Sequence, residues 1–195
     1  MAEGSRYFQE KSALQDTLRS ITSRLDQLGV PYAVAGGLAL FAHGFRRFTE
    51  DVDLLVTAEG LARIHKELEG LGYVQPFKGS KQLRDTDSKV RIEFLVAGQF
   101  PGDGKPKPVA FPDPSAVAFE KDGIKYLKLP TLVELKLASG MSNAARLKDL
   151  ADVLELIKLL AMKRDFAEEL APFVRQKYLE LWDALQQAPK TELPE

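Results

Sequence analysis

The spacing of hydrophobic residues changes along the chain and indicates alternating helices and strands. Between about Tyr7 and Leu28, apolar residues recur every three or four positions, which is typical of an amphipathic helix. The apolar run Tyr32–Ala35 predicts a buried strand, and the pair Gly36-Gly37 marks the turn after it. A second apolar segment, Leu38–Ala42, then indicates a helix.

The middle of the chain predicts further strands of a sheet, with one helix among them. Alternation is clearest in Val90–Val96, where every second residue is apolar and Glu93 lies on the opposite face. An Asp-Gly pair at residues 122–123 predicts a hairpin between two short strands. The expected elements are the strand Asp51–Val56, the helix Glu59–Leu71, and the strands Tyr73-Val74, Gln82–Asp85, Val90–Val96, Val117–Glu120 and Ile124–Leu127.

The last third of the chain is expected to be helical. Thr131 is a candidate cap for a helix that begins at Leu132 and ends at Gly140. A longer helix follows from about residue 144 to 161, and two more are expected near residues 166–171 and 173–187. The predicted buried stripe of the longer helix consists of Leu147, Leu150, Ala151, Leu154, Ile157 and Leu160.

This order of elements predicts an α/β or α+β fold, with a mixed, twisted sheet flanked by helices and a helical C-terminal portion. We divide the chain into a core with its N-terminal helix, residues 1–128, and a helical portion packed on that core, residues 129–195. The length of 195 residues and the hydrophobic content of 45% are enough for one large domain or for a domain with a helical appendage.

Most of the candidate functional residues lie between Tyr32 and Val56. Gly36 and Gly37 have no Cβ, so backbone can approach a ligand closely there, and the helix that they open would direct free N–H groups at an anion such as phosphate. Asp51 and Asp53 are two residues apart, so both side chains leave the same face of a strand. Adjacent carboxylates repel each other unless a cation or a proton intervenes, and their oxygens suit magnesium. Together these features indicate phosphoryl or nucleotidyl chemistry.

The composition of the chain limits which partners and which cellular compartment we expect. The net charge of −1 gives no global electrostatic reason to bind nucleic acid or an anionic membrane, and the basic residues between Lys78 and Arg91 are interpreted mostly as solvated. The absence of cysteine excludes disulfides and thiolate metal sites and fits a reducing compartment. Since no apolar run approaches the roughly 20 residues of a membrane helix, we expect a cytoplasmic protein with no membrane partner.

The residues of the Tyr32–Val56 stretch resemble the nucleotidyltransferase superfamily, which includes DNA polymerase beta. Its pattern is a hydrophobic residue before Gly-Gly or Gly-Ser, then Asp-x-Asp, and later a third acid between apolar residues on a strand. Gly36-Gly37, Asp51-Val52-Asp53 and Glu93 match these parts. The third acid is Glu where Asp is commoner.

The nearer resemblance is to the AbiEii-like bacterial branch, which contains toxins of toxin–antitoxin and abortive-infection systems. That branch shows Arg-x-Thr-x-Asp-x-Asp after its glycines, and here Arg47 and Thr49 precede the two aspartates. It also shows a Lys on a later helix and a basic-Asp pair with another Asp three positions on. Lys136, and Asp149 with Asp152, are similar to these. The resemblance spans about residues 32–160.

The resemblance implies a nucleotidyltransferase fold and an enzyme of the EC 2.7.7 type, which moves a nucleoside monophosphate from a nucleoside triphosphate to an acceptor hydroxyl. Asp51, Asp53 and Glu93 would hold Mg²⁺ or Mn²⁺, and Glu93 could help to deprotonate the acceptor. Asp149 would orient Lys136 or contact the acceptor. The residues implied in nucleotide binding are Gly36, Gly37, Arg47, Thr49, Lys136 and Asp149, and Lys136 is also implied in catalysis. The acceptor could be tRNA, a protein or a small molecule, and a toxin would have an antitoxin protein as partner.

Other interpretations stay open at this point. A catalytically silent module of the same fold would bind a nucleotide or a protein without turnover, and a structural subunit such as an antitoxin would bind no nucleotide. Glu93 could lie on an exposed strand face paired with Arg91. Asp149 and Asp152, one helical turn apart, could form a salt-bridged surface, and Lys136 could extend along its apolar neighbours.

Overall fold

The computed structural model describes residues 2–187, with side chains described from residue 12 onward. These residues form two compact units. The first consists of Met1–Gln99 and Ala110–Leu132, and the second of Phe100–Val109 and Val133–Glu195. The three predicted catalytic acids belong to the first unit, whereas Lys136 and Asp149 belong to the second.

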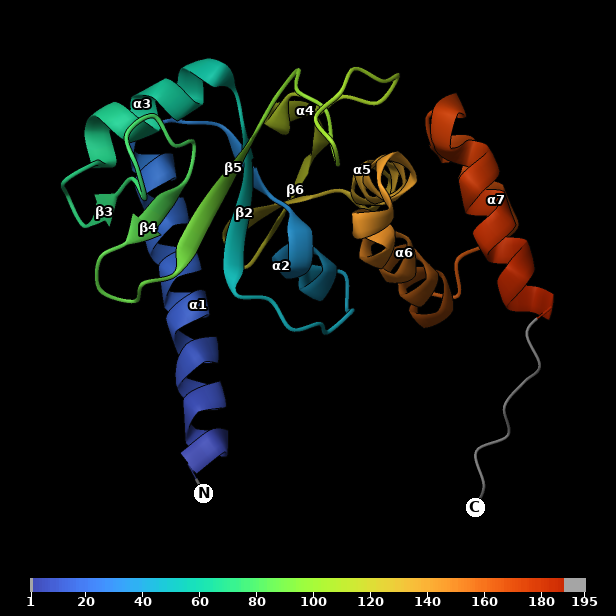
Figure 1. Ribbon diagram of the computed structural model, residues 1–195, viewed down its shortest axis with the longest axis horizontal. Coiled ribbons are helices and arrows are strands. Elements are labelled where there is room, and N and C mark those ends of the chain that lie inside the picture. The colour runs from blue at the N-terminus through green and yellow to red at the C-terminus, as the bar shows by residue number, and fades with distance from the viewer. Residues whose placement is uncertain (1, 188–195) are drawn as a thin grey trace. The chain divides into compact units, whose positions relative to one another are not determined.

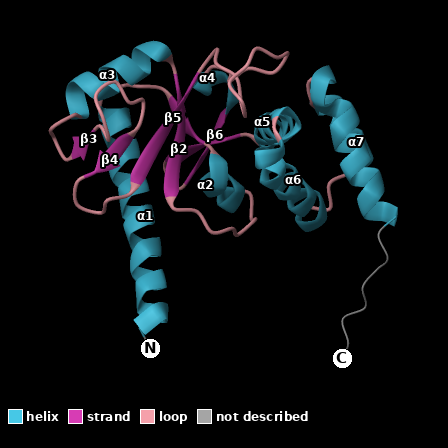
Figure 2. Cartoon of the chain, in the orientation of Figure 1, coloured by secondary structure: helices cyan, strands magenta, loops and turns pink. Residues whose placement is uncertain are grey.

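The first unit is built on a seven-stranded sheet with the strand order β3-β4-β5-β2-β1-β7-β6 (Figures 1 and 2). β2 pairs in parallel with β5 and β1 with β7, and the other neighbours are antiparallel. This mixed sheet with flanking helices confirms the predicted fold class. The elements are α1 (Ala2–Gln27), β1 (Tyr32–Val34), α2 (Gly36–Ala42), β2 (Asp51–Val56), α3 (Ala58–Leu68), β3 (Tyr73–Val74), β4 (Leu83–Asp85), β5 (Arg91–Val96), α4 (Pro114–Val117), β6 (Ala118–Lys121) and β7 (Ile124–Leu127).

The central strands β2 and β5, side by side in Figure 1, have one apolar and one charged face. On the apolar face, alternate residues pack with the apolar stripes of α1 and α3, and burial of this surface is the main stabilising contribution. On the other face, the partly buried side chains of β2 and β5 include carboxylates and an arginine. The core cluster contains Leu14, Leu18, Ile21 and Leu25 of α1, Ile64 and Leu68 of α3, Val52 and Leu54 of β2, and Ile92 and Phe94 of β5.

Local sequence signals explain most element boundaries in the first unit. The Thr57 side chain caps α3 by accepting a hydrogen bond from the Gly60 amide at 2.9 Å. In the predicted hairpin, Asp122 and Gly123 both have positive φ, 52° and 75°, which matches the twist of the paired strands. Three boundaries differ from the prediction by two residues or more. α1 already begins at Ala2, and α2 begins at Gly36, so the predicted glycine turn forms the start of this helix. α3 ends at Leu68 because the next residue turns to an extended conformation.

The second unit is helical and contains most of α5 (Leu129–Ser142), together with η1 (Ala144–Arg146), α6 (Leu147–Leu159), η2 (Arg164–Glu169) and α7 (Pro172–Gln187). α5 begins three residues before the predicted start, so Thr131 lies inside the helix and does not cap it. Gly140 does not end α5 either. It lies within the helix, where an added Cβ would be 2.6 Å from Leu150 Cγ, so the glycine permits this close packing.

The predicted buried stripe of α6 is wrong in part. Leu147 and Leu160 are 59% and 38% exposed, whereas Asp149 and Asp152 are buried together with Ile157. The helix is therefore rotated relative to the face that hydrophobicity alone selects. The physical reason is an ion-pair cluster around Lys136, which gives the two buried aspartates a partner.

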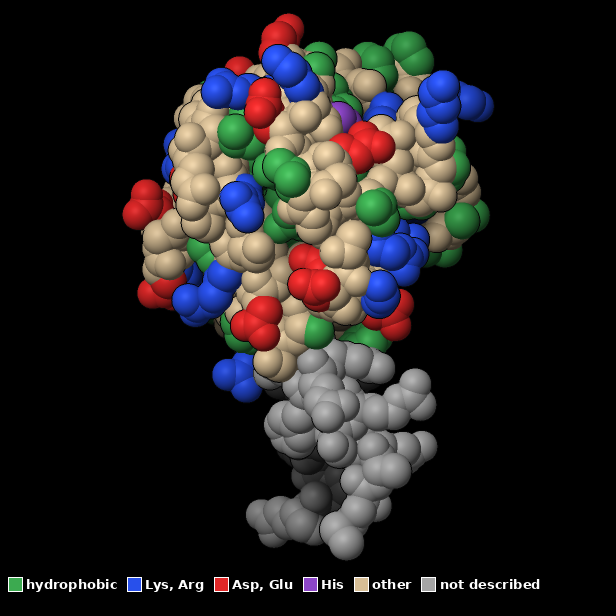
Figure 3. All heavy atoms as spheres, turned by 90° about the vertical axis from the view of Figure 1, so that its left-hand side faces the viewer, with side chains coloured by type: hydrophobic (Ala, Val, Ile, Leu, Met, Phe, Trp, Pro, Cys, Tyr) green, Lys and Arg blue, Asp and Glu red, His purple; other side chains and the backbone are tan. Residues whose placement is uncertain are grey.

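The surface shows no separation of charge on the face drawn in Figure 3, where Lys and Arg side chains are interspersed with Asp and Glu. This agrees with the near-zero net charge of the chain. Within residues 2–187, none of the helices combines the length and the apolar character that crossing a bilayer requires.

Candidate active site

The parallel register of β2 and β5 brings the predicted acids of the first unit to one place. Asp53 is the register partner of Glu93, and Asp51 is the partner of Arg91. Because side chains alternate along a strand, Asp51, Asp53, Arg91 and Glu93 all leave the same face of the sheet. The three acids, which come from two strands far apart in sequence, thus share one face of two neighbouring strands.

Arg91 contacts Asp51, whereas the sequence interpretation considered it only as a partner of Glu93 on an exposed strand face. Its Nε donates to Asp51 Oδ1 at 2.9 Å, and its Nη2 donates to Asp51 Oδ2, which makes a two-point contact. The pKa of Arg91 is raised above its ordinary value, first by the hydrogen bond and charge of Asp51 and then by Glu93 and Asp53. The charges of all three acids therefore act on one cation. The signal in the sequence was the alternation itself, which places Arg91 on the same face as Glu93.

The glycine turn after β1 is in contact with these acids. Gly36 has a φ of +56°, and an added Cβ would lie 1.8 Å from Asp53 Oδ2. The Ala35 amide donates to the Asp53 carbonyl at 2.9 Å, so the strand holding the acid and the turn are joined by backbone as well. Only glycine combines this conformation with such a close carboxylate. The turn and the Asp53 carboxylate therefore form one compact structure.

The next two predicted residues lie in the segment that leads into β2. Thr49 is half-buried against Gly37, where an added Cβ would be 2.7 Å from the Thr49 Cβ. Arg47 is also half-buried. The structure thus places Gly37 and Thr49 in contact, next to the turn that carries Gly36. Their predicted part in nucleotide binding stays a prediction.

In the second unit, the Lys136 side chain is only 9% exposed and lies between two aspartates. Its Nζ donates to Asp149 Oδ1 at 3.0 Å and to Asp152 Oδ2 at 2.6 Å. Ser139 Oγ donates to the second Asp149 oxygen at 2.7 Å, and Arg146 Nε lies 3.2 Å from that oxygen. Lys136 does not merely extend along apolar neighbours, and the two aspartates are not a solvated surface. Their part in nucleotide binding or catalysis stays a prediction.

The charges in this cluster are balanced. Burial by itself would raise the pKa of Asp149, but the charge of Lys136, the hydrogen bonds from Ser139 and Lys136, and the charge of Arg146 outweigh it and hold the pKa below its ordinary value. Asp149 is therefore ionised in the folded protein at neutral pH.

No metal-ligand cluster is evident in residues 2–187: no three His, Cys, Asp or Glu side chains are gathered closely enough to hold a metal ion. In the first unit, the contact between Asp51 and Arg91 explains why the acids do not form such a cluster. The Asp51 carboxylate is directed at the Arg91 guanidinium, which supplies the positive charge that adjacent acids require.

Comparison with solved structures identifies the fold. The antibiotic-resistance factor ANT(2'')-Ia matches in two structures. One, in complex with adenylyl-2''-tobramycin, has a TM-score of 0.50 at 12% identity over 93% of this chain and 99% of that chain. The other, a solution structure, has a TM-score of 0.53 at 14% identity over 88% and 95%. An antigenic nucleotidyltransferase-like protein from Paracoccidioides brasiliensis matches with a TM-score of 0.51 at 19% identity over 90% and 93%.

The chain has the fold of nucleotidyltransferases. Neither the models of known protein families nor the curated proteins give a match to the sequence. Because these three matches are below 20% identity, the shared property is the fold, and the chemistry has to be argued from the residues themselves.

The contact between Gly36 and Asp53 leads to a stability prediction. Gly36→Ala should lower the free energy of unfolding by more than Gly29→Ala, because both glycines have positive φ but only Gly36 has a neighbour within reach of a Cβ. The conformational strain common to both is about 1–2 kcal/mol, and displacement of the carboxylate adds about 1–3 kcal/mol at Gly36. Urea unfolding measures both losses. Equal losses in the two variants would show that the close approach does not constrain the turn.

The buried cluster leads to a prediction of pH dependence. Since the folded-state pKa of Asp149 is lowered, its stabilising contribution is present above the ordinary Asp pKa and is lost as the pH falls through the folded value. Asp149→Asn should cost about 2–3 kcal/mol at pH 7, and its difference from the unmodified protein should shrink toward pH 3.

Denaturant unfolding at several pH values measures this difference. Glu155→Gln is the matched control, because Glu155 forms an exposed ion pair with Lys158 at 2.9 Å on the same helix. That variant should change stability by less than about 1 kcal/mol. A difference for Asp149→Asn that stays constant from pH 7 to pH 3 would contradict the assigned ionisation.

Proposed function

We propose that this chain is a metal-dependent nucleotidyltransferase that moves a nucleoside monophosphate from a nucleoside triphosphate to an acceptor hydroxyl. The observation that carries the proposal is the pairing of Asp53 with Glu93 in the register of β2 and β5, with Asp51 on the same face. The contact of Gly36 with the Asp53 carboxylate adds to it, as does the nucleotidyltransferase fold.

The acids of the first unit are the candidate ligands of a divalent cation, and Asp51 would have to leave Arg91 to take part in holding it. All three are carboxylates on one face, and each raises the pKa of the same arginine, so their negative potential converges on one position. Carboxylate oxygens are the ligands that Mg²⁺ prefers, and Mn²⁺ accepts the same donors. We assign Asp51, Asp53 and Glu93 as the ligands. When bound, the metal would polarise phosphoryl oxygens and offset the charge of the departing pyrophosphate.

The remaining residues of the first unit are assigned to binding and proton transfer. Glu93 would accept the proton of the acceptor hydroxyl. The backbone amides of Gly36 and Gly37 would bind phosphate oxygens, because the missing Cβ atoms leave the backbone accessible there. Arg91 would exchange its contact with Asp51 for a phosphate when substrate binds, since a guanidinium binds either anion at two points.

Within this fold, we assign the chain to the AbiEii-like branch on the pattern Arg47-x-Thr49-x-Asp51-x-Asp53. On this assignment the protein is the toxin of a two-gene system with an antitoxin protein as partner. ANT(2'')-Ia, whose structure contains adenylyl-2''-tobramycin, supports a small-molecule acceptor as an alternative to tRNA or protein.

One observation favours a second candidate, a nucleotide-binding module without turnover. The two-point contact of Arg91 with Asp51 neutralises one of the three acids. If this contact persisted with a nucleotide bound, the site would bind a nucleotide but would lack one of its metal ligands.

A transfer assay separates the two candidates. The protein is incubated with magnesium, each α-labelled nucleoside triphosphate and a cell extract, and label is followed onto RNA, protein and small molecules. We expect transfer by the unmodified protein, and a loss of at least about a hundredfold in Asp51→Asn/Asp53→Asn, the scale seen when a group that stabilises transition-state charge is removed. Glu120→Gln, an exposed acid on β6, is the matched control and should retain activity.

Two results would contradict the enzyme. Equal transfer by the double aspartate variant would remove the assigned residues from the reaction. Magnesium-dependent nucleotide binding without transfer to any acceptor would support the second candidate instead.

A further inference from the structure

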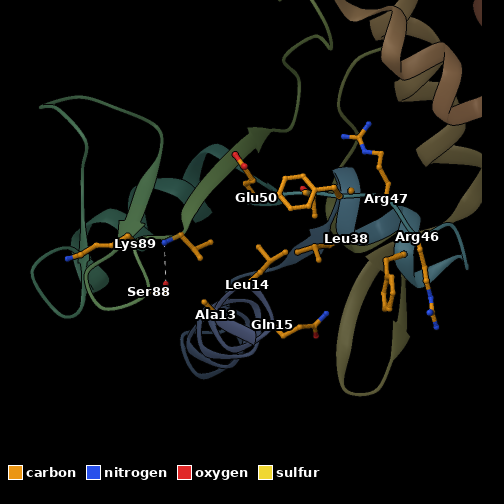
Figure 4. A pocket seen from close by; sticks show the side chains of 14 residues that line it. Ala13, Leu14, Gln15, Leu38, Arg46, Arg47, Glu50, Ser88 and Lys89 are labelled. Carbon is orange, nitrogen blue, oxygen red and sulfur yellow. Dashed lines mark hydrogen bonds between the residues drawn. The ribbon is translucent and has the colours of Figure 1, made fainter. Parts of the chain in front are cut away.

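A cavity of about 440 Å³ lies in the first unit, beside the candidate active site. Its walls come from four segments that are distant in sequence: α1, α2, the segment before β2 and the turn before β5 (Figure 4). None of Asp51, Asp53 and Glu93 lines it. It shares only Gly37, Arg47 and Thr49 with the residues assigned to nucleotide binding. The cavity therefore adjoins the site of the proposed reaction without including its three acids.

The walls of the cavity are largely apolar. Leu14 of α1 and Leu38 of α2 extend toward each other in Figure 4, and Val90 contributes another aliphatic side chain. Phe41 and Phe48 also line the cavity although they are 39% and 59% exposed, which is unusual for large aromatic residues. Two exposed aromatic rings around an apolar hollow are suited to a flat, apolar ligand.

The charged residues around the cavity are predominantly basic. Arg46, Arg47 and Lys89 line it, against the single acid Glu50. The Arg46 guanidinium carbon lies 5.9 Å from the centre of the Phe41 ring, so this cation is held beside an aromatic wall of the cavity. Such a placement suits a ligand whose aromatic body enters the cavity and whose anionic group stays at the edge.

We propose that this cavity is a binding site for a small aromatic molecule with one negatively charged group. The aromatic body lies between Leu14, Leu38 and the phenylalanine rings, and Arg46 contacts the anion. A volume of about 440 Å³ falls in the range of ligand pockets, about 300–1,000 Å³. The proposal does not depend on nucleotidyl transfer, because it concerns binding at residues other than the three acids.

The site also borders the glycine turn. Thr49 and Gly37 line the cavity and are in contact with each other. Gly37 directly follows Gly36, the residue that contacts Asp53. A ligand in the cavity consequently lies against the segment that positions the turn.

Calorimetric titration of the full chain with 2-naphthoate tests the proposal, and 2-naphthylmethanol serves as the uncharged analogue. We expect 2-naphthoate to bind with a Kd below about 1 mM, since weaker binding would correspond to less than about 4 kcal/mol of free energy. Arg46→Gln should weaken naphthoate about tenfold, the effect of one charge-assisted hydrogen bond, and should leave binding of the alcohol unchanged. Arg63→Gln, an exposed arginine on α3, is the matched control and should have no effect.

A second variant fills the cavity. Ala13→Phe adds a ring to the α1 wall without removing any packed atom, and should abolish binding of both compounds. Ala62→Phe places the same ring on the exposed surface of α3 and should leave binding intact. Unchanged binding in Ala13→Phe, or no binding by the unmodified protein, would overturn the proposal.

Methyl NMR of the unmodified protein gives a test that needs no variant. Addition of 2-naphthoate should shift the methyl signals of Leu14, Leu38 and Val90 and leave Ile64, in the core under α3, in place. Shifts confined to other methyl groups would place the ligand elsewhere and contradict the assignment.

Discussion

The parallel register between β2 and β5 is the constraint on which the rest of the candidate site depends. It sets Asp53 beside Glu93 and Asp51 beside Arg91, on a face that also receives the glycine turn. Carboxylates held this way repel each other and demand positive charge. Arg91 meets part of that demand in the structure. The same register places the alternate residues, Val52 with Ile92 and Leu54 with Phe94, in the hydrophobic core. Folding of the core therefore also assembles the charged face.

The two units handle buried or half-buried charge in different ways. In the second unit, Lys136 neutralises Asp149 and Asp152 inside the protein, and Ser139 and Arg146 contact the second Asp149 oxygen. Each of these buried charges has an oppositely charged partner, as buried charges require. In the first unit, three acids share one half-buried face with one arginine, and all three raise the pKa of that arginine. Carboxylates that share one face are the donors that a cation site uses.

Short-range patterns were enough to predict much of the first unit. Alternation in Val90–Val96 and the Asp-x-Asp spacing placed the acids on strands, and Asp122-Gly123 predicted the hairpin. The pairing of β2 with β5 did not follow from periodicity, because register depends on contacts between strands far apart in sequence. The buried face of α6 was predicted wrongly for a related reason. Hydrophobicity selects Leu147 for that face, but the ion pairs with Lys136 bury Asp149 and Asp152 instead. The role of Arg91 and the cavity near Leu14 likewise arise only from tertiary structure.

The most direct test of this account is the affinity for Mn²⁺, measured by electron paramagnetic resonance in the presence of a non-hydrolysable nucleotide. If Asp51, Asp53 and Glu93 act together on one cation, the unmodified protein binds Mn²⁺, and Asp53→Asn binds it at least about tenfold more weakly, the lower end of the effect of disturbing a metal site. Glu120→Gln retains the affinity of the unmodified protein. The same Mn²⁺ affinity in Asp53→Asn as in the unmodified protein would contradict the central claim that these carboxylates form a cation site.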